Sequence, residues 1–269
     1  MAGLFKSKFV LLVIFLYLIV VFWCIYLYSQ GLKDSPLNFY FNIAYALLFF
    51  SSTYLVFNNF RKITDSDKKW SVLFFGLATA SFGVGLLIWA FYNLALKVSI
   101  PFPTIADVFF LAYYFLALTG SIYFLRSLRV TINKLFIYDS VVVLVLSLMV
   151  IVGIFNFIIK PQSENPLSQV INTIYPIGSG ILVAIAVIGL RLNTAKMRLP
   201  LILIAIAFIF STAADVLFSL RTNLELYWNG DISDLLFATD GLFYFLGLYS
   251  FINNNGINSE EARADIVQA

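Results

Sequence analysis

Residues 9–28 read FVLLVIFLYLIVVFWCIYLY, twenty positions without a charged side chain. An α-helix needs about 20 apolar residues to cross the hydrocarbon core of a bilayer. Lys6 and Lys8 precede the stretch, as in a signal peptide, but the stretch is too long for one and no small-residue cleavage pattern follows. We therefore expect a retained transmembrane helix.

The rest of the chain has the same character as this first stretch. Of 269 residues, 61% are hydrophobic and 12% are charged, which is a membrane composition. Seven more apolar runs of spanning length follow. The sequence predicts an all-α, polytopic integral membrane protein with eight transmembrane helices, at 8–29, 38–59, 70–95, 107–126, 135–159, 170–192, 199–220 and 233–252.

The basic residues predict the orientation of these helices. With a cytoplasmic N-terminus, thirteen of the 17 Lys and Arg residues fall on the cytoplasmic side, and only Lys33, Lys97, Lys160 and Arg221 fall outside. Such an excess follows the positive-inside rule. We expect a multi-pass protein of the cell membrane with both termini in the cytoplasm. The same topology explains why the basic residues lie at helix ends, so we expect no nucleic-acid partner.

Two segments suggest an internal repeat. Residues 103–110, PTIADVFF, resemble residues 230–237, GDISDLLF, at an offset of 127, and Gly120 and Gly247 keep that offset. Adding 127 to the first four spans places them close to the last four. We predict two parallel four-helix repeats, 1–134 and 135–252, and then a short polar cytoplasmic tail, 253–269. Regular helix spacing alone is the alternative explanation.

Five acidic residues lie in or beside the predicted spans. Asp107 and Asp234 begin helices with capping-box-like spacing, and the helix dipole favours an acid there. Asp139 lies about one turn from the cytoplasmic end of its span. Asp215 and Asp240 lie deeper, where a carboxylate costs ~2.5–3.5 kcal/mol on insertion scales.

The similar depth of Asp215 and Asp240 on successive helices predicts a polar pocket that opens to the outer side. The candidate ligand-binding residues are Asp215, Asp240, Trp89, Tyr92 and Trp228. Two simpler explanations remain open. Tryptophan and tyrosine collect at membrane interfaces in any case, and a protonated aspartate also stabilises contacts between helices.

Several classes of chemistry have no support in the sequence. The chain has no histidine, which removes imidazole metal ligands and histidine-dependent nucleophiles. Phosphate-binding loops, dinucleotide-binding glycine patterns and hydrolase motifs are also missing. We therefore predict no catalytic residues, no metal site, no cofactor and no enzymatic activity.

Residues 101–114, PFPTIADVFFLAYY, with Gly120, carry a family resemblance. The segment is similar to the P-x-P-S-x-A-D-x-x-Y-L-x-x-Y stretch of multi-helix membrane modules in bacterial and archaeal signalling proteins. Those modules precede diguanylate cyclase, phosphodiesterase or histidine kinase domains. The resemblance covers about a fifth of the chain and implies a sensory or anchoring module. An output domain is missing here, so enzymatic signalling is not implied.

These observations favour a non-enzymatic sensory or scaffold module with an outward-facing polar pocket. We expect it to lie in the lipid bilayer and to act through a cytoplasmic or membrane partner protein or a second copy of itself. The first alternative is a small-solute or cation/proton-coupled transporter that uses the same acids. The second is a structural subunit of a larger membrane complex.

Overall fold

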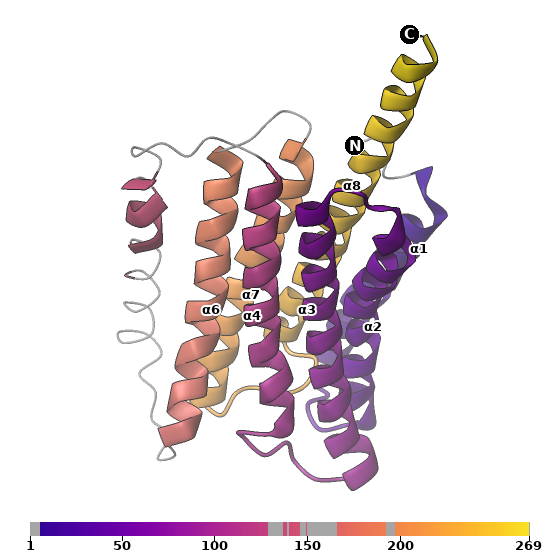
Figure 1. Cartoon of the computed structure of the whole chain (residues 1–269). Helices are drawn as coiled ribbons and strands as arrows, with labels where there is room; N and C mark the ends of the chain where they lie inside the picture. The colour runs from indigo at the N-terminus through magenta and orange to yellow at the C-terminus, as the bar shows by residue number, and fades with distance from the viewer. Residues whose placement is uncertain are drawn as a thin grey trace.

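The computed structural model describes residues 6–128, 137–138, 140–145, 149, 166–191 and 197–268, with side chains up to residue 253. Every regular element in these ranges is a helix (Figure 1). The long helices are α1 (Lys8–Ser29), α2 (Pro36–Asn59), α3 (Ser66–Phe91), α4 (Ile105–Ser127), α6 (Pro166–Arg191), α7 (Arg198–Asn223) and α8 (Ile232–Gln268). Two short elements, η2 (Phe60–Lys62) and the π-helical η3 (Tyr92–Leu96), continue α2 and α3.

Seven helices in the described part of the chain are long and apolar enough to cross a membrane. This confirms the prediction of an all-α, multi-pass membrane protein. The structure describes seven such helices where eight were predicted. The predicted fifth span, 135–159, and Asp139 within it lie outside the described residues, apart from short stretches.

Six of the seven long helices begin one to four residues before the apolar runs that predicted them, and three of these starts show why. α2 begins at Pro36, because proline is favoured at the first helical position and Ser35 and Asn38 form a capping box ahead of it. α3 begins at Ser66, after Asp65 accepts a hydrogen bond from the amide of Lys68. α6 begins at Pro166, four residues before its predicted start. The initiating residues are polar or proline, so hydropathy alone does not locate them.

Six helices form a closed ring. Each of the pairs α2–α3, α3–α4, α4–α6, α6–α7 and α7–α8 packs together, and α8 returns to α2. α1 lies outside the ring and packs against α2 and α8. Ring formation therefore needs two contacts between helices distant in sequence, α2 with α8 and α4 with α6.

Aromatic side chains fill the interior of the ring. The largest fully buried side chains include Tyr45, Tyr113 and Tyr244. α1 shows the opposite pattern, because Phe15 and Phe22 are 62% and 67% exposed. Outward apolar side chains are what a lipid-facing helix presents, so the burial pattern agrees with a bundle that lies in a membrane.

The bundle has two distinct ends. α1 begins and α8 ends at the upper end of Figure 1, and the residues predicted as a polar tail continue α8 as a helix to Gln268. We call the opposite end, with the loops 30–35, 97–104 and 224–231, the distal end. The polar side chains of the candidate site lie from this end inward.

Candidate ligand-binding site

The acids at the starts of α4 and α8 cap their helices, as predicted. The hydroxyl of Thr104 accepts from the amide of Ala106 at 2.9 Å, and Asp107 accepts from the amide of Thr104. On α8, Asp234 Oδ2 accepts from the amide of Gly230 at 2.7 Å. A carboxylate in the first turn of a helix is stabilised there by unpaired amides and the helix dipole.

Tyrosines from other helices or loops also hold these acids. The hydroxyl of Tyr175 on α6 donates to Asp107 at 2.5 Å, and that of Tyr227 donates to Asp234 at 3.2 Å. Burial and the neighbouring Asp234 raise the pKa of Tyr227 well above its usual value. The Tyr227 phenol therefore stays protonated and keeps its role as a donor.

The two deeper acids each meet a tyrosine of α4. Both carboxylate oxygens of Asp215 accept from the hydroxyl of Tyr114, at 2.8 and 2.7 Å. Asp240 accepts a weaker hydrogen bond from the hydroxyl of Tyr113 at 3.4 Å. Asp215 is 2% exposed and Asp240 is fully buried. Thus α4 places a tyrosine hydroxyl against each of the two deep acids.

The inner cavity lies in the middle of the ring. Its volume is about 30 Å³, which exceeds the roughly 10–15 Å³ that one buried water molecule needs. All six helices of the ring contribute to its wall. The lining residues are Tyr45, Phe82, Trp89, Phe110, Tyr114, Tyr175, Asp215, Phe218 and Phe237. Eight of these nine side chains are aromatic, and the ninth is a carboxylate.

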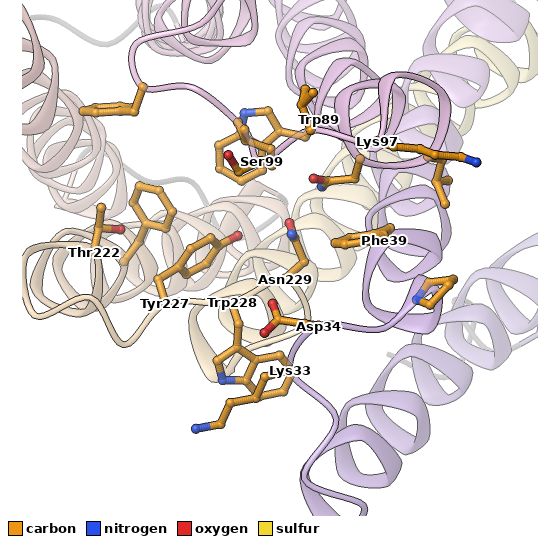
Figure 2. A pocket seen from close by; sticks show the side chains of 17 residues that line it. Lys33, Asp34, Phe39, Trp89, Lys97, Ser99, Thr222, Tyr227, Trp228 and Asn229 are labelled. Atoms are coloured by element: carbon orange, nitrogen blue, oxygen red, sulfur yellow. The ribbon is translucent and has the colours of Figure 1, made fainter.

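The distal cavity is much larger, at about 620 Å³, and lies at the distal end of the bundle. Figure 2 shows Trp89, Tyr227 and Trp228 among the side chains that surround it. The lining residues are Lys33, Asp34, Pro36, Phe39, Trp89, Asn93, Leu94, Lys97, Val98, Ser99, Ile100, Phe102, Phe218, Thr222, Tyr227, Trp228 and Asn229.

Two aromatic residues belong to both cavities. Trp89 of α3 and Phe218 of α7 line the distal cavity on one side and the inner cavity on the other. Their rings stack with centroids 5.9 Å apart and planes at 29°. This stacked pair therefore borders both spaces.

The predicted site residues occupy different places. Asp215 lines the inner cavity, Trp89 lines both cavities and Trp228 lines the distal one. Asp240 is buried beside Tyr113 and belongs to the wall of neither. Tyr92 lies half-buried in η3 and lines neither cavity.

Sequence reasoning missed the tyrosines of the site. Tyr113, Tyr114 and Tyr175 contact the buried acids, and none was a candidate. The sequence held one indication of these contacts. Tyr113 precedes Asp240 by 127 residues, the offset of the predicted repeat, so the two residues are at equivalent positions.

The deep acids have no cationic partner among the described residues. The basic side chains with assigned ion pairs lie elsewhere: Arg221 pairs with the buried Asp231 at the distal end, and Arg126 pairs with Asp67 on the surface. No cluster of three or more candidate metal ligands occurs in the described ranges. The interior of the ring thus combines aromatic faces with acids that form no ion pair with a basic side chain of the described ranges.

Comparison with known protein families, with characterised proteins and with solved structures found no match for this chain. The fold and the site define its class, a polytopic helical membrane protein with a ring of six helices around a small aromatic cavity. Such cavities between helices of a bundle are common places for ligands.

Proposed function

We propose that this chain is a non-enzymatic membrane sensory module that binds its ligand from the distal side and acts through a partner protein. One observation carries the proposal: two cavities follow one another from the distal end and share the rings of Trp89 and Phe218, and Asp215 lines the inner one. Among the described residues, the fully buried rings of Tyr113 and Tyr244 pack beyond the inner cavity, and the next cavity, lined by Phe75 and Phe208, has a volume of only about 10 Å³. A pocket that packed rings close off in this way suits binding better than passage.

The proposal includes the two four-helix repeats, and the packing order of the helices supports them. If the chain is two four-helix repeats, then α2, α3 and α4 of the first repeat are equivalent to α6, α7 and α8 of the second. The contact of α2 with α8 is then equivalent to the contact of α6 with α4. Both pairs pack together. Tyr113 and Asp240, which are 127 residues apart, are hydrogen-bonded to each other. Equivalent positions touch in this way where they lie beside a two-fold axis.

Hydrogen bonds at the distal end follow the same relation. The side-chain amide of Asn38 on α2 donates to the carbonyl oxygen of Asn229 at 2.9 Å. The hydroxyl of Ser168 on α6 donates to the carbonyl oxygen of Phe102 at 3.4 Å. The acceptors Phe102 and Asn229 are 127 residues apart. The donors Asn38 and Ser168 are 130 apart, which is also the distance between the first residues of α2 and α6. The two bonds therefore occupy similar places in the two halves, with three more residues between α4 and α6 than the offset of 127 gives. The pocket then lies at the junction of two similar halves, as in transporters and other duplicated membrane folds.

The orientation of the module follows from the charge distribution. In the predicted eight-span topology, thirteen of 17 basic residues fall on the side of the termini, so we infer from the positive-inside rule that this side is cytoplasmic and that the distal cavity faces outward. The resemblance of residues 101–114 to membrane modules of signalling proteins supports a sensory role. A cytoplasmic or membrane partner protein, or a second copy of the chain, would carry the signal onward.

A labelling experiment tests the outward-facing pocket. Cys24 is buried and is the single cysteine, so a Cys24→Ser background is available. Ser99→Cys places a thiol on the distal cavity, and Ser66→Cys places one at the other end of the bundle. We expect a membrane-impermeant maleimide to label residue 99 in intact cells and residue 66 only after permeabilisation. The reverse pattern would overturn the orientation.

A flux assay separates binding from transport. In proteoliposomes, a sensory module should show no more K⁺ or proton flux than empty vesicles. Flux that the wild type supports and the Asp215→Asn variant loses would overturn the sensory proposal in favour of a cation- or proton-coupled transporter. Asp67→Asn, on the surface at the opposite end of α3, is the matched control for removal of one carboxylate.

A further inference from the structure

The inner cavity has a wall of unusual chemistry for a space within a membrane bundle. Eight aromatic side chains surround a single carboxylate, that of Asp215. The face of an aromatic ring carries negative potential and attracts cations. An apolar ligand would gain nothing from the buried acid, and an anion would be repelled by it. The wall therefore suits a positively charged ligand group.

The carboxylate of Asp215 has acceptor capacity left over. The hydroxyl of Tyr114 lies within hydrogen-bond distance of both oxygens but donates only one proton, and the hydroxyl of Ser179 on α6 is the second donor to this carboxylate. A carboxylate offers about four acceptor sites. No basic side chain of the described part forms an ion pair with it. A cation that carries several N–H donors would complete its hydrogen bonds and neutralise its charge.

The size of the cavity selects among cations. A cavity of about 30 Å³ holds only a small group, since one buried water molecule needs roughly 10–15 Å³ of such volume. The –NH₃⁺ head of an alkylamine has that size, whereas a trimethylated head is several times larger. Metal cations of similar size prefer a shell of six or more oxygen ligands, and among the lining residues only Asp215 and the tyrosine hydroxyls offer oxygen atoms.

The distal cavity provides space for the rest of such a ligand. Trp89 and Phe218 belong to both walls, so a rearrangement of this stacked pair would let a carbon chain extend from the inner cavity into the distal volume of about 620 Å³. A free alkylamine and the ethanolamine headgroup of a lipid both fit this description, because each ends in a primary ammonium group.

We propose that the inner cavity is a binding site for a primary ammonium group, with Asp215 as its counter-ion and the surrounding aromatic rings as its cage. The proposal rests on the sensory function argued above, because the ligand enters from the distal side. It adds the chemical class of the ligand.

Tryptophan fluorescence of the full-length protein provides a direct readout. Trp89 touches both cavities, so a variant with Trp23, Trp70 and Trp228 changed to Phe reports on the site alone. In phosphatidylcholine nanodiscs, propylammonium chloride should give a saturable change in Trp89 fluorescence. Propylammonium chloride should also raise the midpoint of thermal unfolding of the wild-type protein, in which all four tryptophans are kept. Potassium chloride and tetramethylammonium chloride at equal ionic strength should do neither.

Variants connect this response to the site. Asp215→Asn should weaken propylammonium binding at least tenfold, and Asp67→Asn should leave it unchanged. Phe237→Leu removes one ring of the cage but keeps the carboxylate, so it should weaken binding by about two- to fivefold. If Asp215→Asn does not fold, the Phe237→Leu variant still tests whether propylammonium binds in the inner cavity.

The outcomes separate the ligand source and the two proposals. Weaker apparent binding of propylammonium in phosphatidylethanolamine nanodiscs would identify the lipid headgroup as a competitor, and equal binding would favour a free amine. An equal response to potassium, or an undiminished response in Asp215→Asn, would overturn the ammonium site. If residue 99 is labelled from outside but propylammonium has no effect, this inference fails alone. If residue 99 is inaccessible from outside, the proposed function fails.

Discussion

The substitution Tyr114→Phe probes the buried contact between α4 and α7. It removes one oxygen atom and keeps the ring that lines the inner cavity. The lost hydroxyl lies 2.8 and 2.7 Å from the two oxygens of Asp215. Tyr114 is 6% exposed and Asp215 is 2% exposed, so little solvent reaches the carboxylate to replace the lost hydrogen bonds.

Two general magnitudes bound the cost of Tyr114→Phe. A hydrogen bond to a charged group contributes about 1.5–3 kcal/mol in water-soluble proteins. Double-mutant cycles between transmembrane helices average ~0.6 kcal/mol and reach ~1.7 kcal/mol, because the unfolded state in lipid also finds partners. The Tyr114 hydroxyl contacts both oxygens of a buried acid, so we place it near the upper limit. Tyr114→Phe should lower the free energy of unfolding by about 1–2 kcal/mol.

Reversible unfolding by dodecyl sulfate in mixed micelles, followed by circular dichroism at one pH, measures this change. The control is Tyr54→Phe, because that ring is 59% exposed on the outside of the bundle and should change the free energy by less than about 0.5 kcal/mol. A cycle with Asp215→Asn should give a coupling energy of about 1 kcal/mol or more. A loss below about 0.5 kcal/mol in Tyr114→Phe, or additive effects in the cycle, would refute the reasoning.

Two further predictions concern packing and charge. A Cβ atom on Gly85 would lie 2.5 Å from Cε1 of Phe110, so Gly85→Ala should destabilise the bundle by about 1–3 kcal/mol in the same unfolding assay, and an unchanged midpoint would contradict the close approach of α3 and α4. Arg221→Met leaves the fully buried Asp231 without its cation and should cost about 3–5 kcal/mol. Arg126→Met breaks a largely exposed ion pair and should cost at most about 1 kcal/mol. Equal thermal shifts in these two arginine variants would rule out this ranking.

Most helices of this protein can be predicted from its sequence. Uncharged stretches of about 20 residues have few alternatives to a membrane-spanning helix, and seven predicted spans overlap the helices α1–α4 and α6–α8. The errors lie at helix starts such as Pro36 and Ser66, where capping and backbone geometry rather than hydropathy decide the first turn.

The candidate ligand-binding site could be predicted only in part. The depth of Asp215 and Asp240 indicated that they lie in the interior, and the structure buries both. The contacts of these acids with Tyr114 and Tyr113 could not be predicted, because they depend on the order of the helices around the ring. That order is decided by the packing of α4 on α6 and α2 on α8, which links helices far apart in sequence. Hydrophobic pattern alone does not encode such contacts.

The continuation of α8 beyond the bundle has a mechanical consequence. Its 37 residues form one uninterrupted helix, about 55 Å long at 1.5 Å per residue. Asp234 and Asp240 lie near one end of this rod, and Gln268 marks the other. Because a rigid rod amplifies rotation in proportion to its length, a tilt of about 5° about the distal end would carry the far end through roughly 5 Å. The same tilt moves Asp240, about 12 Å from the distal start of α8, by about 1 Å, so a displacement at that depth is roughly five times larger at Gln268.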